Sequence, residues 1–164
     1  MNTVEQELFV DGLPIPRRLA ALIYQGLWPR TERDARKQLI KSLVQKDRIQ
    51  LFASGEDQIY LKNPPFYTVA TRVRSQGPGK FWSNFAALED ISPELSVFIG
   101  DFGLGSDSPI LLDYREDRSN PAVIRLKWRK AIGLPNVWVR CANNFDEFAD
   151  MLGLDGGDLT SKNS

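Results

Sequence analysis

Four short segments rich in β-branched and aromatic residues follow one another in the second half of the chain, and this succession constrains the fold most strongly. They are SVFIG at 96–100, PILLDYR at 109–115, AVIRLKW at 122–128 and VWVRCA at 137–142. Runs of this length and composition, bounded by turn-forming residues, predict β-strands. Strands that follow one another so closely predict an antiparallel or mixed sheet.

The alternation within 122–128 predicts how this sheet is covered. Ile124, Leu126 and Trp128 occupy one set of alternate positions, and Val123, Arg125 and Lys127 occupy the other. We therefore expect a sheet with one solvent-exposed face, and we expect Trp128 and Trp138 to pack in the core.

Helical signals surround the strand-rich region. The sequence predicts a short helix within 13–28 that ends at Gly26, and a second helix capped by Thr31 with a stripe of apolar residues. The closing segment combines the capping pair Asn144 and Glu147 with the stop signal Gly153. The stripe of the second helix comprises Ala35, Leu39, Ile40, Leu43 and Val44, and that of the closing helix Phe145, Phe148, Ala149 and Leu152.

The middle of the chain is interpreted as β-structure. IQLFA at 49–53 and QIYL at 58–61 predict a hairpin across a turn-rich spacer, and FYTVATRV at 66–73 predicts an edge strand. The order of elements predicts a single α+β domain over residues 1–154, with N-terminal helices and a C-terminal helix against the sheet. Residues 155–164 are expected to be a polar, disordered tail.

Charge and cysteine content restrict the environment. Lys plus Arg equal Asp plus Glu at 21 each, which argues against general nucleic-acid binding. No apolar stretch approaches the roughly 20 residues needed to span a bilayer, and residues 1–12 lack signal-peptide order. Cys141 is the only cysteine and is expected to be a buried, inert thiol. We expect no membrane association and a cytoplasmic location.

The chain contains no histidine, which restricts its chemistry further. Histidine is the commonest general base, the usual partner of a Ser or Cys nucleophile and the commonest transition-metal ligand. No recurring catalytic or metal-binding spacing of carboxylates is present either. We therefore predict a protein that is not an enzyme, with no catalytic residues, no cofactor and no metal site.

Acidic residues gather in the second half, and they predict a docking face for a basic partner protein. Trp82, beside Phe81 in a glycine-bounded loop, is the tryptophan expected to be exposed. The predicted partner-binding residues are Trp82, Asp101, Asp107, Asp113, Glu116 and Asp117. Ordinary solvated loop charge, a carboxylate-based hydrolase or a carbohydrate-binding protein using Trp82 and the same acids, and self-association are the alternatives.

The sequence also resembles a known superfamily. IGDFGLGSDSPILLDYR at 99–115, NPAVIRLKW at 120–128, the Trp138 strand and FDEFADMLGL at 145–154 resemble the SUKH superfamily, as does IYLKNPPF at 59–66. This superfamily includes fungal Smi/Knr cell-wall assembly regulators and bacterial immunity proteins. The resemblance implies a non-catalytic α+β binding scaffold whose partner is a protein, such as a basic bacterial toxin domain that it neutralises.

Overall fold

The structure, a computed structural model, describes residues 8–53, 55–103, 108–128 and 136–154. Its centre is an antiparallel sheet in the order β3 (Ile59–Leu61), β5 (Ser96–Phe102), β6 (Pro109–Asp113), β7 (Ala122–Lys127) and β8 (Val137–Ala142). The short strand β4 (Tyr67–Thr68) pairs with β5 beside β3. A separate two-stranded sheet joins β1 (Phe9–Val10) and β2 (Leu13–Pro14).

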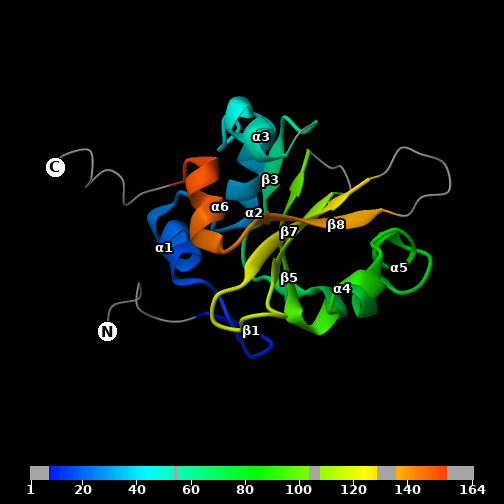
Figure 1. Cartoon of the computed structure of the whole chain (residues 1–164). Helices are drawn as coiled ribbons and strands as arrows, with labels where there is room; N and C mark the ends of the chain where they lie inside the picture. The colour runs from blue at the N-terminus through cyan, green and yellow to red at the C-terminus, as the bar shows by residue number, and fades with distance from the viewer. Residues whose placement is uncertain (1–7, 54, 104–107, 129–135, 155–164) are drawn as a thin grey trace, which may run out of the picture.

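Helices cover both faces of the sheet, which confirms an α+β fold (Figure 1). On one face, α1 (Arg17–Gln25), α3 (Lys46–Phe52) and α6 (Phe145–Leu152) cover the larger apolar cluster. On the other, α4 (Val69–Gln76) and α5 (Phe81–Asn84) cover a smaller one. The remaining short helical segments are α2 (Glu32–Arg36), η2 (Lys37–Leu39), η3 (Leu88–Asp90) and η4 (Pro93–Leu95).

The prediction of one solvent-exposed sheet face is wrong. Every residue of β6 is buried, and so is every residue of β7 except Lys127. The alternation of polar and apolar residues in β7 was misleading because Arg125 is itself buried. Its guanidinium forms an ion pair with Glu56 at 2.8 Å and lies 5.1 Å from the centre of the Phe102 ring.

Local capping signals were predicted correctly. Thr31 accepts a hydrogen bond from the Asp34 amide at 3.1 Å, and Asn144 accepts one from the Glu147 amide at 2.8 Å. Gly26 and Gly153 adopt the left-handed conformation that ends α1 and α6. All four residues predicted for the apolar stripe of α6 are buried.

The apolar stripe predicted for the second helix is mostly exposed, because α2 ends at Arg36 and only a 3₁₀ turn follows. Ala35 and Val44 are buried, but Ile40 is 93% exposed, and Leu39 and Leu43 are exposed as well. Tertiary packing rather than the 3.6-residue period therefore decides which of these side chains enter the core.

The predicted hairpin is also wrong, since residues 46–52 form the helix α3 and only 59–61 form a strand. A short apolar run does not distinguish a strand from a buried helix. Here Ile49 and Ala53, four residues apart, are both buried on one side of the helix. Similarly, only Tyr67–Thr68 of the predicted edge strand is extended. The Thr68 hydroxyl accepts from the Thr71 amide at 3.2 Å and so begins α4.

Candidate protein-docking surface

Two tryptophans differ from the prediction: Trp82, expected to be exposed, is buried, and Trp128, expected to be buried, is exposed. Trp82 on α5 is only 3% exposed, and its ring packs edge-on against Phe81 and Phe98 at 5.5 and 5.6 Å between ring centres. Trp128, expected in the core, follows the end of β7 and is 44% exposed. Trp82 is therefore not accessible to a partner, whereas Trp128 is.

The predicted acidic residues do not share one face. Asp101 and Asp113 lie at opposite ends of the β5–β6 pair, because Asp101 aligns with Pro109 and Asp113 aligns with Ser96. Asp113 is buried and bonds to the Arg115 guanidinium at 2.8 Å. This hydrogen bond raises the pKa of Arg115, so its guanidinium keeps its positive charge.

Glu116 and Asp117 also have partners within the chain. Glu116 accepts from Arg140 at 2.8 Å. Asp117 accepts from the Ser119 hydroxyl at 2.8 Å and the Ser119 amide at 2.9 Å, and these bonds lower the pKa of Asp117. Asp107 lies outside the described residues. Where they are described, these carboxylates stabilise turns and strand ends instead of forming a common acidic surface.

Three other aromatic residues form a cluster at the surface, which we call the aromatic patch: the exposed Phe85 and Trp128 and the partly buried Phe81. The ring centres of Phe85 and Trp128 are 5.8 Å apart, and Phe81 lies 6.3 Å from each of them. Phe85 is 50% exposed. The patch therefore joins the end of α5 to the end of β7, two segments more than 40 residues apart in the sequence.

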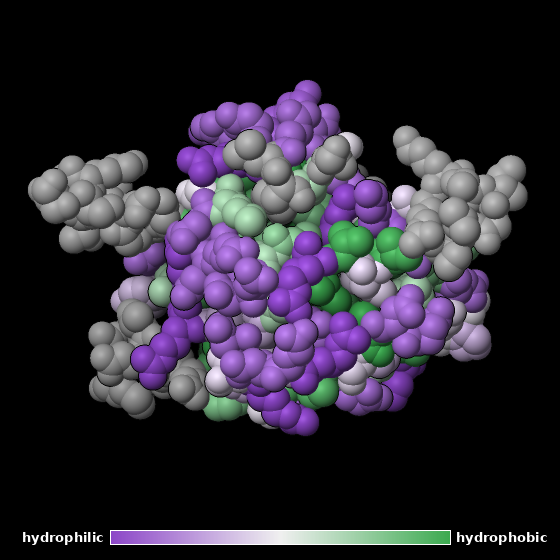
Figure 2. Space-filling model, viewed as in Figure 1, coloured by the Kyte–Doolittle hydropathy of each residue, from purple (hydrophilic) through white to green (hydrophobic). Residues whose placement is uncertain are grey.

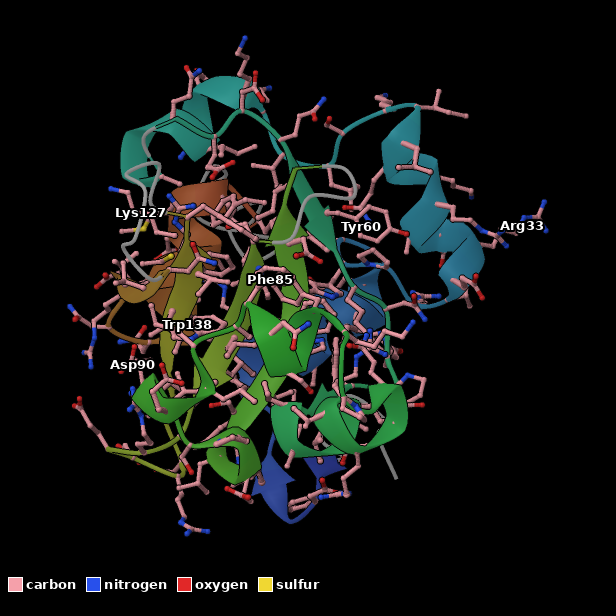
Figure 3. The ribbon with its side chains drawn as sticks, turned by 90° about the vertical axis from the view of Figure 1, so that its right-hand side faces the viewer. Arg33, Tyr60, Phe85, Asp90, Lys127 and Trp138 are labelled. Carbon is pink, nitrogen blue, oxygen red and sulfur yellow. The ribbon has the colours of Figure 1, made fainter. Side chains whose placement is uncertain are left out.

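Hydrogen bonds to main-chain carbonyls hold the segment of the patch that carries Phe85. The Trp138 indole N–H donates to the carbonyl of Ala86 at 2.7 Å, and the Asn136 amide donates to that of Phe85 at 3.0 Å. Figure 3 shows Phe85 and Trp138 on the side of the sheet that α4 and α5 cover. A patch fixed in this way loses little conformational entropy on binding.

A signal for the patch was present in the sequence. Phe81 and Phe85 are four residues apart, which places them on one side of a helical turn, and Trp82 points elsewhere. The contribution of Trp128 could not be foreseen, since it depends on where β7 ends relative to α5.

The sheet edge at β8 lies next to the patch. β8 pairs with β7 and, within the described residues, with no other strand. Val137, Trp138, Val139 and Cys141 are only partly buried. In Figure 2 hydrophobic residues framed by hydrophilic ones are visible to the right of centre, over the region of β7 and β8 in Figure 1. An apolar edge strand of this kind can pair with a strand from another chain.

Two further observations on the described residues concern metal binding and thiol reactivity. No group of three or more His, Cys, Asp or Glu side chains that could hold a metal ion is found among them. Burial raises the pKa of Cys141 to about 12, so its thiol is protonated near neutral pH and is a weak nucleophile. No helix in the described ranges is long and apolar enough to cross a membrane.

Comparison with protein-family models, with curated proteins and with solved structures finds no match to this chain. The resemblance to the SUKH superfamily accordingly stays a prediction that is based on residues and motifs alone.

Proposed function

We propose that the chain is a non-catalytic protein-binding module that docks its partner on the aromatic patch and the adjacent β8 edge. The observation that carries this proposal is the contact between Phe85 and Trp128, two large rings that are about half exposed. The Asn136 amide holds the main chain at Phe85. Aromatic side chains are enriched in interface cores and provide much of the binding energy there.

This surface changes the expected chemistry of the partner. An acidic face would select a basic protein, whereas the aromatic patch and the edge strand select an apolar side chain and an extended segment. The SUKH resemblance suggests a toxin domain that the module neutralises, and the cytoplasm is the location that we propose for this encounter.

The alternative of a hydrolase or carbohydrate-binding protein has less support. It depends on Trp82 as the sugar platform and on acids such as Asp113, and both of these side chains are buried. Phe85 and Trp128 are exposed, but their rings are tilted by 34° and do not form one flat platform.

Photo-crosslinking in cells of the source organism tests the docking surface. A benzoylphenylalanine at position 85 is compared with one at position 24, because Tyr24 is an aromatic residue of similar exposure on α1, on the other side of the sheet. We expect a protein that is crosslinked from position 85 and not from position 24. The same set of products from both positions would contradict the proposal, and crosslinks only between copies of the chain would assign the patch to self-association.

The purified partner then permits a quantitative test. Phe85→Ser and Trp128→Ser should each weaken binding at least tenfold by calorimetry, as expected for aromatic hot spots, while Tyr24→Ser leaves it unchanged. If a toxin domain is encoded beside this chain, co-expression with the chain should restore growth. Co-expression with the Phe85→Ser variant should restore it less.

A further inference from the structure

A second surface of the molecule lies at the β3 edge of the sheet and belongs to residues 30–43, which we call the basic apolar segment. This segment contains α2 and η2. The Gln38 side chain hydrogen-bonds to both main-chain groups of Leu61 and so fixes the segment to β3. Because β3 and β8 lie at opposite ends of the strand order, this surface is separate from the β8 edge. Figure 3 shows Arg33 of the segment and Lys127, which precedes Trp128, on opposite sides of the molecule.

Three apolar side chains of the basic apolar segment are exposed. Leu39, Ile40 and Leu43 lie within five residues of the chain, and Ile40 is 93% exposed. They are the members of the predicted helical stripe that the fold leaves outside its core. A single exposed leucine is ordinary, whereas neighbouring apolar side chains on a surface often mark a site where another molecule binds. Covering them with a partner removes apolar surface from water, which favours binding.

The same segment has a surplus of positive charge. Residues 30–43 contain five cations and two carboxylates, although the whole chain contains equal numbers of both. The carboxylate of Glu32 lies 4.0 Å from Arg36, and that of Asp34 lies 3.8 Å from Lys37. The other three cations form no ion pair with any described residue, and they are Arg30, Arg33 and Lys41.

Part of this charge surrounds a pocket of about 320 Å³. The charged residues of its walls are Arg30, Asp34, Lys37 and Lys41, which gives the walls a net charge of two positive. The only carboxylate among them is therefore already balanced by Lys37. Leu43 lines the same pocket and places an exposed apolar side chain beside the cations.

The position of Arg30 in the pocket wall is fixed by α1. Its guanidinium donates to the carbonyl of Ile23 at 2.8 Å and to that of Tyr24, both in the last turn of α1. Because carbonyl groups carry no net charge, they hold the side chain without cancelling its positive charge. A carboxylate that enters the pocket can accept charge-assisted hydrogen bonds from these cations.

The combination of charge and shape indicates which negatively charged molecule fits. A membrane surface presents a layer of lipid head groups, whereas a pocket beside Leu43 suits a single protruding side chain. Nucleic-acid bases stack on aromatic rings, but the exposed apolar residues here are leucine and isoleucine. A polypeptide can place a carboxylate in the pocket and an apolar side chain next to it on Leu39 and Ile40.

We propose that the basic apolar segment docks an acidic segment of a partner protein. An Asp or Glu side chain of the partner enters the pocket between Lys37 and Lys41, and an apolar side chain packs on Leu39 and Ile40. The inference goes beyond the proposed function, because this surface involves neither the aromatic patch nor the β8 edge. Opposite charges accelerate such an encounter, and added salt slows it.

Selection of random peptides displayed on phage, with the full chain as the target, tests this proposal. We expect the enriched peptides to share Asp or Glu beside Leu, Ile or Phe. In calorimetry with a synthetic enriched peptide, Lys41→Glu should weaken binding about tenfold or more, because repulsion replaces a charge-assisted hydrogen bond. Ile40→Ser should weaken it roughly tenfold, since an apolar contact is lost. Lys127→Glu is the matched control, because Lys127 is also exposed and lies far from Arg33 in Figure 3.

Three outcomes would overturn the proposal. Equal binding of the enriched peptide to the natural chain and to Lys41→Glu would place the peptide elsewhere. Enrichment of no peptide would show that the segment is not a docking site for polypeptides. Tighter binding to phosphatidylserine vesicles or to a single-stranded oligonucleotide, lost in Lys41→Glu, would assign the surface to a lipid or a nucleic acid. Each of these outcomes leaves the crosslinking test of the aromatic patch unaffected.

Discussion

The side chain of Gln38 pairs with the main chain of Leu61 as a neighbouring strand would. Its amide nitrogen donates to the Leu61 carbonyl and its amide oxygen accepts from the Leu61 amide, both at 2.9 Å. The Trp28 indole donates to the carbonyl of the next residue, Lys62, at 2.8 Å. These side chains cover the β3 edge of the sheet, whereas the described residues provide no such cover for β8. One edge is closed and the other can accept a strand.

Replacing Gln38 with leucine should destabilise the protein by about 1 to 3 kcal/mol, because both main-chain groups of Leu61 then lack a partner in a buried position. Chemical denaturation measures this change. Gln50→Leu serves as the control, since Gln50 is exposed and should alter stability by less than about 0.5 kcal/mol. Equal effects of the two substitutions would show that the Gln38 bonds contribute nothing.

The buried pair of Arg125 and Glu56 should respond asymmetrically to substitution. Glu56→Ala leaves a buried guanidinium without its counter-ion and should lower the free energy of unfolding by about 3 kcal/mol. This value is at the lower end of the range for broken buried ion pairs, because the Glu56 side chain is 26% exposed. Arg125→Met removes the charge that needs compensation and should cost less. In the double variant, Glu56→Ala should add little to the destabilisation that Arg125→Met causes alone. A purely additive double-mutant cycle, measured by denaturation, would contradict this coupling.

Because the thiol of Cys141 is buried, the free energy of unfolding should depend on pH in the alkaline range. Its pKa is raised from 9.0 to about 12 by burial, so the unfolded chain loses this proton at lower pH than the folded chain. The contribution to stability is full below pH 9 and is lost as the pH rises from 9 towards 12. The free energy of unfolding should therefore fall more steeply across this window in the natural chain than in Cys141→Ala. Tyr114, whose pKa is also raised, is present in both proteins and cancels in the comparison. Parallel curves would show that Cys141 ionises equally in both states.

Trp138→Phe tests how the aromatic patch is held. The substitution keeps a ring but removes the indole N–H that donates to the Ala86 carbonyl, and it should cost about 1 kcal/mol in the free energy of unfolding. It should also weaken partner binding, although Trp138 is not a member of the patch, because the segment that carries Phe85 becomes less ordered. Binding that is unchanged in this variant would show that the order of the patch is unimportant.

Sequence and structure agree where the signal is local. The caps at Thr31 and Asn144 and the left-handed glycines at 26 and 153 depend only on residues within one helical turn, so their spacing predicts them correctly. The four strands after residue 95 were also predicted from composition. Three of them, β5, β6 and β7, are almost wholly buried, and buried strands need continuous apolar runs.

The sequence by itself determined the α+β class, the caps and the strands of the second half. The tertiary structure alone decided that residues 46–52 are helical, that Trp82 is buried and Trp128 exposed, and that Arg125 is tolerated inside the sheet. Each of these outcomes depends on contacts between distant segments. One example is the ion pair of Arg125 and Glu56, which are 69 residues apart in the sequence. Burial is a property of the packed whole, so local periodicity could not predict the aromatic patch.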